Sequence, residues 1–193
     1  MIALTPHPST PENAWTVSAL AERTADDDLR LRYVLHGPLD AIRLPPPGPL
    51  RRADRLWEHT CAEAFVAAAG TAAYVELNFS PSREWAAYAF TAYRAAGPLA
   101  ATALEPRIVV RRERDTVALD VLVALADLSC SYRDAVLRVG LSVVVAATDG
   151  RLSYWALHHP SPRPDFHHPD GFTLRLEPPR TTDVDRGDRG SPT

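Results

Sequence analysis

Tryptophan side chains are the residues of this chain best suited to holding a small molecule. Three of the four, Trp57, Trp85 and Trp155, lie in segments rich in other apolar residues. An indole ring has a flat apolar face that can stack on the apolar face of a sugar ring, while flanking polar groups read the hydroxyls. Tryptophan is also common in protein interiors, so the alternative interpretation is that these rings belong to the core.

Three carboxylates interrupt apolar runs, at Glu63, Glu76 and Asp120. A buried carboxylate without a partner is costly, so each is expected to be paired, exposed or functional. Two carboxylates about 5–9 Å apart would suit glycoside hydrolysis. We favour a simpler interpretation, because every second side chain of a strand points away from the core. In that interpretation the three groups face solvent or pair across a sheet with an arginine of segment 107–112.

Two histidine pairs, at 158–159 and 167–168, bracket a proline-rich segment that also contains Asp165. Imidazole and carboxylate groups suit zinc or iron, so His159, Asp165 and His167 are the candidate metal ligands. Adjacent side chains of a strand point to opposite faces, so only one histidine of each pair can readily bind the same ion. The spacing matches no metal motif with a known mechanism. We therefore favour a rigid loop held by local hydrogen bonds, and we predict no metal site.

No motif of a common enzyme class is present in the sequence. There is no nucleophile elbow, no phosphate-binding loop and no dinucleotide-binding fingerprint. Cys61 and Cys130 have no histidine at a spacing typical of a nucleophilic cysteine, and each lies in an apolar stretch that favours a free thiol over a disulfide. These observations favour binding over catalysis.

Composition restricts the partners that this chain is expected to have. The formal net charge is −3, and all 21 basic residues are arginine, with no basic stripe of the kind that binds nucleic acid. No apolar run approaches the roughly 20 residues that span a bilayer. The first residues lack the charged and apolar regions of a signal peptide. We expect no nucleic-acid partner, no membrane partner and a cytoplasmic location.

Alternation of apolar and polar residues predicts an all-β chain. In segment 29–36 four apolar residues at every second position share one face, as in a half-buried strand. Asp149-Gly150 between two apolar runs predicts a hairpin. One short helix is predicted near residues 126–137. Strands are expected at 15–22, 29–36, 39–44, 60–68, 73–80, 85–93, 107–112, 117–125, 139–147, 152–158 and 172–176.

Many short strands without helices between them predict two packed antiparallel sheets, with a closed barrel as the alternative. The sandwich domain is expected to span residues 13–177. Residues 1–12 contain three prolines and are predicted to form an N-terminal arm outside the fold. Residues 178–193 have few apolar side chains and are predicted to form a disordered tail.

Two blocks within this pattern resemble a known family. Residues 56–65, LWEHTCAEAF, resemble the Leu-Trp, acidic, Glu-x-Phe pattern of family 9 carbohydrate-binding modules and related DOMON-like domains. Residues 74–81, YVELNFSP, resemble the strand that follows in the same families. Blocks at 85–88 and 152–157 lie where a DOMON-like group of bacterial proteins carries similar residues. The resemblance covers about residues 14–177.

This resemblance implies an immunoglobulin-like or jelly-roll-like sandwich that binds sugars, haem or other ligands. In the modules that this chain resembles, two tryptophans sandwich the ligand. By that resemblance Trp57 and Trp155 are the expected ligand contacts. Glu58, Asn78 and Arg83 are the expected hydrogen-bonding partners.

Glu63 also belongs to the family pattern and is expected to serve as a structural or ligand-binding carboxylate. DOMON domains that carry haem b use a methionine and a histidine as axial ligands, and the only methionine here is Met1, so we expect no cofactor. The function predicted is a non-catalytic module for a carbohydrate or another small molecule. The alternatives are a protein-interaction module, including a homodimer through exposed edge strands, and a metal-dependent hydrolase that uses the histidine-rich loop 158–168.

Overall fold

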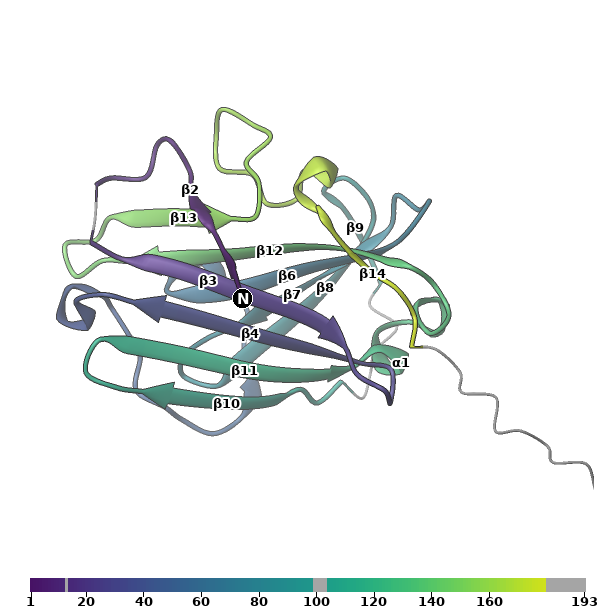
Figure 1. Ribbon diagram of the computed structural model, residues 1–193, viewed down its shortest axis with the longest axis horizontal. Coiled ribbons are helices and arrows are strands. Elements are labelled where there is room, and N and C mark those ends of the chain that lie inside the picture. The colour runs from purple at the N-terminus through teal and green to yellow at the C-terminus, as the bar shows by residue number, and fades with distance from the viewer. Residues whose placement is uncertain (13, 99–103, 180–193) are drawn as a thin grey trace, which may run out of the picture.

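The computed structural model describes residues 1–12, 14–98 and 104–179. In this part of the chain the backbone forms two β-sheets that pack face to face, as the ribbon in Figure 1 shows. The ladders of the described residues are antiparallel, apart from the pairing of β5 (Arg51–Arg52) with β8 (Glu84–Ala92). The predicted antiparallel β-sandwich is therefore confirmed.

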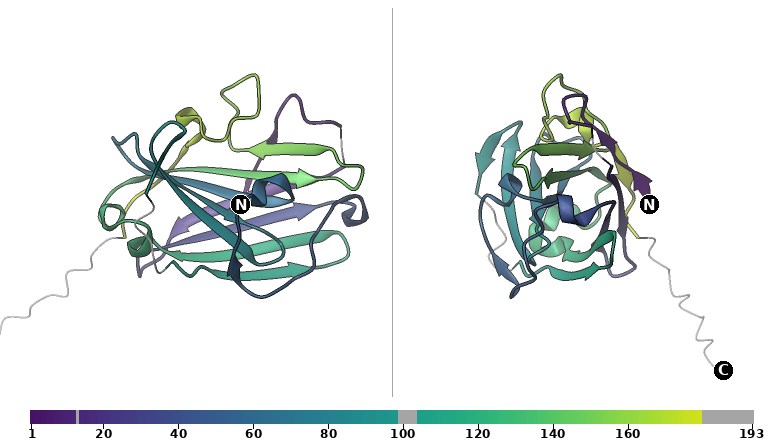
Figure 2. Two further views of the ribbon diagram at one scale, coloured as in Figure 1. Left: turned by 180° about the vertical axis from the view of Figure 1, so that it is seen from behind. Right: turned by 90° about the vertical axis from the view of Figure 1, so that its left-hand side faces the viewer.

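The two sheets differ in size, and Figure 2 shows them from behind and from one end. The smaller sheet runs in the order β1 (Ile2–Ala3), β3 (Thr16–Arg23), β4 (Asp28–His36), β11 (Thr116–Ala124) and β10 (Arg107–Arg112). The larger sheet runs in the order β2 (Thr5–Pro6), β13 (Leu152–Ala156), β12 (Leu137–Ala146), β6 (Cys61–Ala68), β7 (Tyr74–Phe79), β8 and β5. At its sides β14 (Leu174–Leu176) pairs with β12, and β9 (Ala95–Gly97) pairs with β8.

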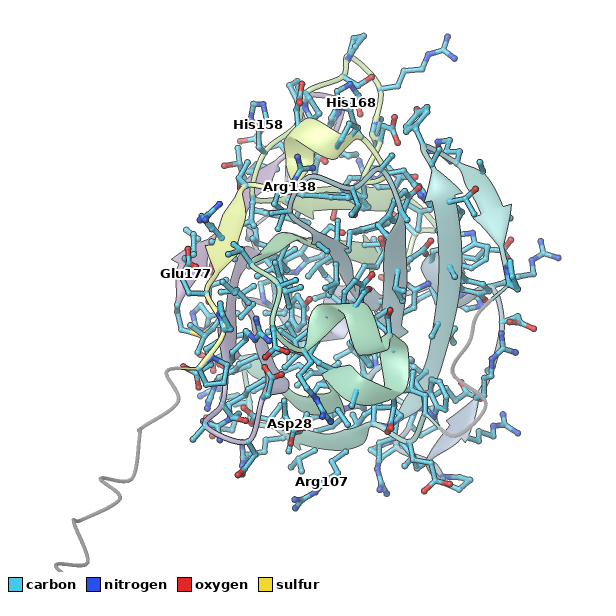
Figure 3. All side chains as sticks on the ribbon, turned by 90° about the vertical axis from the view of Figure 1, so that its right-hand side faces the viewer. Asp28, Arg107, Arg138, His158, His168 and Glu177 are labelled. Atoms are coloured by element: carbon cyan, nitrogen blue, oxygen red, sulfur yellow. The ribbon has the colours of Figure 1, made fainter. Side chains whose placement is uncertain are left out.

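Alternating side chains build the core between the sheets. In β4, Leu29, Leu31 and Tyr33 are buried, whereas Arg30 and Arg32 point outward. The pattern follows from the strand period of two, which puts successive side chains on opposite faces. A view along the sandwich shows side chains filling the space between the sheets (Figure 3).

The larger sheet is buried on both of its faces near its centre. Every residue of β6 and β7 is buried. On β6, Ala62, Ala64 and Val66 belong to the core between the sheets, and the intervening side chains point to the outer face. Loops and aromatic side chains cover that outer face. The sheet therefore positions a second, smaller buried region outside the main core.

The segment 39–44, predicted as an edge strand, is not one. It forms a short 3₁₀ turn, Leu39–Ala41, and then a single bridge between Ile42 and Ala147. The prolines on either side explain the difference. Pro38 and Pro45 have no N–H group to donate to a ladder, so the stretch between them is too short to pair regularly.

The predicted helix near 126–137 exists but is shorter than expected. Only Leu125–Leu128 are α-helical among the described residues, and a 3₁₀ turn, Cys130–Tyr132, follows. Ser129 ends the helix in an extended conformation, and its hydroxyl accepts a hydrogen bond from the Ser131 N–H at 3.2 Å. A serine side chain that bonds its own neighbouring backbone competes with helix continuation.

The N-terminal dozen residues, predicted to lie outside the fold, are part of both sheets. Residues of β1 pair with β3, and residues of β2 pair with β13. Leu4 between them is buried in the core. Pro6 is tolerated because β2 is an edge strand, where one missing ladder donor does little harm. The predicted tail from residue 180 onward lies outside the described residues.

The hairpin predicted at Asp149-Gly150 is confirmed. It joins β12 to β13, which pair antiparallel. Gly150 has a φ of +89°, a conformation that favours glycine, and its N–H donates to the Ala147 carbonyl at 3.0 Å. This turn sets the register of β13 on β12 and so decides which β13 side chains face outward.

Cys61, on β6, is a buried free thiol.

Candidate functional site

A cleft of about 570 Å³ lies on the outer face of the larger sheet, on the side away from the smaller sheet. Outward-facing side chains of β6, β7, β8, β12 and β13 form its floor and lower walls. The 3₁₀ turn Leu56–Glu58 forms part of its rim, and the loop that follows β13 contributes the remainder. The cleft is therefore built from both local strand alternation and a long-range loop.

Two carboxylates occupy the floor of the cleft. Glu63 on β6 lies opposite both Asn78 on β7 and Ser142 on β12, and Glu76 on β7 lies opposite Phe65. Because Glu63 and Glu76 are diagonal neighbours on adjacent strands, their side chains share one patch of the sheet face. Only 3% of Glu63 and 6% of Glu76 is exposed to solvent.

The carboxyl group of Glu63 has one hydrogen bond to the described residues. The Ser142 hydroxyl donates to its Oε2 atom at 3.3 Å. Burial, together with the nearby Glu76, raises the pKa of Glu63 to about 8 despite that hydrogen bond. No cation among the described residues forms an ion pair with Glu63. This carboxyl group is therefore mostly protonated at neutral pH.

Glu76 accepts a hydrogen bond from the Asn78 side-chain amide, with 2.7 Å between Nδ2 and Oε1. Burial raises the pKa of Glu76, although the bond from Asn78 and the charge of Arg94 act in the opposite direction. Asn78 itself is fully buried, and its Oδ1 atom has no hydrogen-bond partner among the described residues. With Glu63 and Glu76 ionised, the floor has more hydrogen-bond acceptors than donors.

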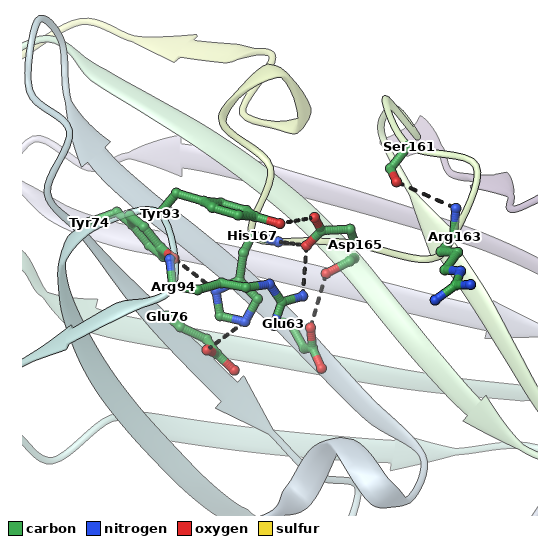
Figure 4. A network of polar contacts seen from close by, with 10 residues as sticks. Glu63, Tyr74, Glu76, Tyr93, Arg94, Ser161, Arg163, Asp165 and His167 are labelled. Carbon is green, nitrogen blue, oxygen red and sulfur yellow. Dashed lines mark hydrogen bonds and ion pairs between the residues drawn. The ribbon is translucent and has the colours of Figure 1, made fainter.

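His167, from the loop after β13, reaches back to this floor (Figure 4). The Tyr74 hydroxyl lies 2.8 Å from His167 Nδ1 and accepts a hydrogen bond from the Arg94 N–H at 3.1 Å. Burial and the charge of Arg94 lower the pKa of His167 to about 4, although Asp165 opposes the shift. The ring is therefore neutral near pH 7, and its contact with Glu76 is not an ion pair at that pH.

Asp165 holds the same loop to the turn between β8 and β9. It accepts hydrogen bonds from the Tyr93 hydroxyl at 2.6 Å and from Arg94 Nη2 at 2.8 Å. Burial would raise the pKa of Asp165, but the bonds from Tyr93 and Arg94 outweigh burial and lower it. The His167 N–H also donates to Asp165 at 3.2 Å. Asp165 is therefore a structural anchor that fixes His167 above the floor.

Aromatic rings form the walls of the cleft. Trp57, 39% exposed, meets Tyr88 edge-on with 5.6 Å between the ring centroids. Tyr154 and Phe166 lie 6.2 Å apart in another part of the lining, and Phe90 also contributes. Flat apolar faces beside polar groups are suited to a ligand that has both apolar and hydroxyl-bearing surfaces.

Three of the predicted ligand residues do not line the cleft. Trp155 is 5% exposed and packs in the core between the sheets, because its partner on β12 is the core residue Val143. Its neighbour Tyr154 faces the cleft instead. Arg83 lies in the turn before β8, where it contacts the Gly48 carbonyl. The third is Asn78, which supports Glu76 from a fully buried position.

Trp57, Glu58 and Glu63 do line the cleft, and all three belong to the block 56–65. Several other lining residues were not predicted, among them Tyr88, Phe90, Arg94, Tyr154 and Phe166. The alternation of side chains along β8 could have predicted two of these, Tyr88 and Phe90. Once Trp85 of β8 is in the core, Tyr88 and Phe90 must face outward.

The favoured interpretation of the carboxylates is correct for Asp120 and wrong for Glu63 and Glu76. Asp120 pairs with Arg111 on β10, and Arg32 Nη1 lies 3.4 Å from its Oδ1. Glu63 and Glu76 also face outward, but the loop and the aromatic walls bury them. The arginines of β10 belong to the other sheet and do not reach them.

The candidate metal ligands do not converge. Among the described residues there is no group of three or more His, Cys, Asp or Glu side chains that could hold a metal ion. His159 lies 2.9 Å from the Thr5 carbonyl through Nε2 and packs edge-on against His7. Asp165 already accepts hydrogen bonds from Tyr93 and Arg94.

No helix in residues 1–12, 14–98 and 104–179 is long and apolar enough to cross a membrane.

Comparisons with known proteins identify the fold. No family model and no curated protein matches the sequence. A protein from Bacteroides uniformis ATCC 8492, proposed to bind carbohydrate, aligns over 91% of this chain and 86% of its own, with a TM-score of 0.61 and 16% identity. A family 9 carbohydrate-binding module from Caldicellulosiruptor kristjanssonii in complex with glucose aligns over 94% of this chain and 88% of its own, with a TM-score of 0.61 and 8% identity.

A further structure of a family 9 module from Caldicellulosiruptor kristjanssonii contains cellotriose. It aligns over 95% of this chain and 86% of its own, with a TM-score of 0.57 and 8% identity. At these identities the likeness concerns the path of the backbone. This chain therefore has the same β-sandwich fold as those carbohydrate-binding modules.

Proposed function

We propose that this protein is a non-catalytic carbohydrate-binding module and that the sugar binds in the cleft on the outer face of the larger sheet. The observation that carries the proposal is the combination of aromatic walls and buried polar groups in one cleft. Trp57, Tyr88 and Tyr154 offer ring faces, and Glu63 and Glu76 offer oxygen atoms beneath them.

The size and composition of the cleft support a small-molecule ligand. Its volume of about 570 Å³ is within the range of about 300–1,000 Å³ typical of such sites. The lining is mostly aromatic and aliphatic, with a few polar groups on the floor. A sugar ring needs this combination, because its ring hydrogens are apolar and its hydroxyls require partners.

The shared fold adds support from a separate line of evidence. Two of the similar solved structures are carbohydrate-binding modules with glucose or cellotriose bound. The finer assignment, to the DOMON-like relatives of these modules, rests on the sequence blocks 56–65 and 74–81.

Titration calorimetry of the intact chain with glucose and with cellotriose tests the proposal. We expect saturable binding of at least one of these sugars. Trp57→Ala should weaken it at least about tenfold, since removal of a central tryptophan contact commonly has that effect. Trp57→Phe keeps an aromatic face and should retain most of the affinity. Val109→Ala, at an exposed position of β10 on the other sheet, is the surface control. Absence of binding by both sugars would contradict the proposal.

A further inference from the structure

The positive charge that lines the cleft is already paired. The charge of Arg94 acts on Glu76, but its guanidinium donates through Nη2 to Asp165 at 2.8 Å. At the rim, Glu58 is already paired with Arg55. His167 is neutral near pH 7, as argued above. Among the described residues, no free positive charge therefore faces Glu63 and Glu76.

In their ionised forms, the carboxylates of this floor have acceptor atoms that lack donors. The Glu63 carboxylate accepts one hydrogen bond among the described residues, from the Ser142 hydroxyl. Glu76 Oε1 accepts from Asn78, but Oε2 lies 3.6 Å from His167 Nε2, which is too long for a hydrogen bond. Buried acceptors without donors are unfavourable, so a bound group rich in donors would stabilise this patch.

We infer that the floor formed by Glu63 and Glu76 recognises a positively charged amino group, and that the ligand is a sugar with an unacylated amine. This inference rests on the proposed function and specifies the class of sugar. An ammonium group has three donors and no acceptor, which complements a patch of acceptors better than a hydroxyl does. Its charge also supplies the partner that allows a buried carboxyl group to ionise.

The aromatic rings around the floor also favour a positively charged amino group. Phe65 and Phe90 line the cleft beside the carboxylates, and Tyr88 lies opposite Glu76 on the next strand. Aromatic faces attract cations within about 6 Å, and the attraction is stronger where water is excluded. An acetylated amine would bring one N–H donor, a carbonyl acceptor and no charge. It would therefore gain less from this floor than an ammonium group does.

Calorimetry with three sugars that differ at one position tests the inference. Glucose has a hydroxyl at that position, glucosamine an ammonium and N-acetylglucosamine a neutral amide. We expect glucosamine to bind about tenfold or more tighter than glucose at pH 7, since a charge-assisted hydrogen bond commonly has that effect. N-acetylglucosamine should bind no better than glucose. Equal binding of glucose and glucosamine would overturn the inference and leave the proposed function standing. Absence of binding by all three would overturn the inference, and absence of cellotriose binding as well would overturn the proposed function.

Substitution of one carboxylate of the floor tests whether that carboxylate causes the preference for glucosamine. Glu63→Gln keeps the size of the side chain and removes its charge, so the ratio of glucosamine to glucose affinity should fall to about one. Glu22→Gln is the same change on β3 of the other sheet and should leave that ratio unchanged. A persistent preference in the folded Glu63→Gln protein would overturn the inference. If that variant does not fold, Glu76→Gln provides the same comparison.

Discussion

The Nε2 atom of His167 lies 3.6 Å from the Oε2 atom of Glu76, so a loop residue and a strand residue meet at the floor of the cleft. The Tyr74 hydroxyl accepts from the Arg94 backbone N–H and lies 2.8 Å from His167 Nδ1 on the other side of the ring. This contact connects the loop after β13 to the centre of the sheet.

Removal of that connection should loosen the loop. His167→Ala leaves the Tyr74 hydroxyl without its imidazole partner and removes ring contacts to Phe65 and Phe90, 5.1 and 5.0 Å away between centroids. We expect urea denaturation to show a loss of about 1–3 kcal/mol, together with weaker sugar binding. His158→Ala, at an exposed position of the same loop, is the control and should change the stability by less than about 0.5 kcal/mol. Equal stability of the two variants would contradict this role of His167.

Glu63 should make the protein less stable as the pH rises from about 6.5 to 8. Burial raises its pKa from 4.5 to about 8, so in this window the folded state holds a proton that the unfolded state has released. Folded protein binds more protons, and the free energy of unfolding therefore falls with pH, by up to about 1.4 kcal/mol per pH unit. The raised pKa of Glu76 acts in the same direction.

Below pH 6.5 the lowered pKa of His167 has the opposite sign, because the unfolded state then binds the extra proton and stability falls as the pH falls toward 4. The window above pH 6.5 therefore isolates the carboxyl groups. Urea denaturation at pH 6.5 and at pH 8 measures the slope. Glu63→Gln should reduce it, and an unchanged slope in that variant would show that Glu63 is not its source.

Alanine substitution of the two tryptophans predicted as ligand contacts should lower the free energy of unfolding by clearly different amounts. Trp155→Ala removes a buried core side chain and should lower the free energy of unfolding by about 3–5 kcal/mol. Trp57→Ala truncates a side chain that is 39% exposed and should change stability much less, by about 1 kcal/mol or below. Thermal and chemical denaturation of both variants provide the test. A larger stability loss in Trp57→Ala than in Trp155→Ala would contradict the placement of Trp155 in the core and of Trp57 in the cleft wall.

The N-terminal segment should support one wall of the cleft. The Thr10 hydroxyl accepts from the Tyr154 N–H at 3.0 Å and donates to the Tyr154 carbonyl at 3.3 Å. Thr10→Val is close in shape and removes both bonds, so we expect a stability loss of about 1 kcal/mol and weaker binding through Tyr154. Thr5→Val, whose side chain is exposed on β2, is the matched control. Identical behaviour of the two variants would argue against this support.

Gly140 on β12 should not tolerate a larger residue. A β-carbon there would lie 2.8 Å from Phe172 Cδ1 and 3.3 Å from the Gly171 carbonyl oxygen. Gly140→Ala must displace the Phe172 ring, which stacks on Phe65 with 5.6 Å between centroids. We expect a loss of about 1–3 kcal/mol by denaturation. Gly48→Ala, whose β-carbon would meet nothing closer than 3.6 Å, is the control and should be nearly neutral.

The sequence by itself determined the long strands and the sandwich. Apolar residues at every second position predict which stretches pair, since a strand puts alternate side chains on opposite faces. The Asp149-Gly150 turn was predictable because few residue pairs fit a tight hairpin. The block 56–65 was sufficient to identify Trp57 and Glu63 as residues of interest, and both line the cleft.

Only the tertiary structure decided which aromatic residue of β13 faces the ligand. Alternation requires that either Tyr154 or Trp155 points inward, and it does not say which. The register of β13 on β12 places Trp155 opposite the core residue Val143, and Tyr154 turns outward as a result.

Tertiary structure also decided that the outward carboxylates are buried. A strand pattern shows that Glu76 leaves the main core, but it contains no information on what covers the other face. Here the cover comes from His167, which is 93 residues away in sequence from the Tyr74 that holds it. Contacts between such distant residues depend on the whole folded chain, because local periodicity extends only over one strand.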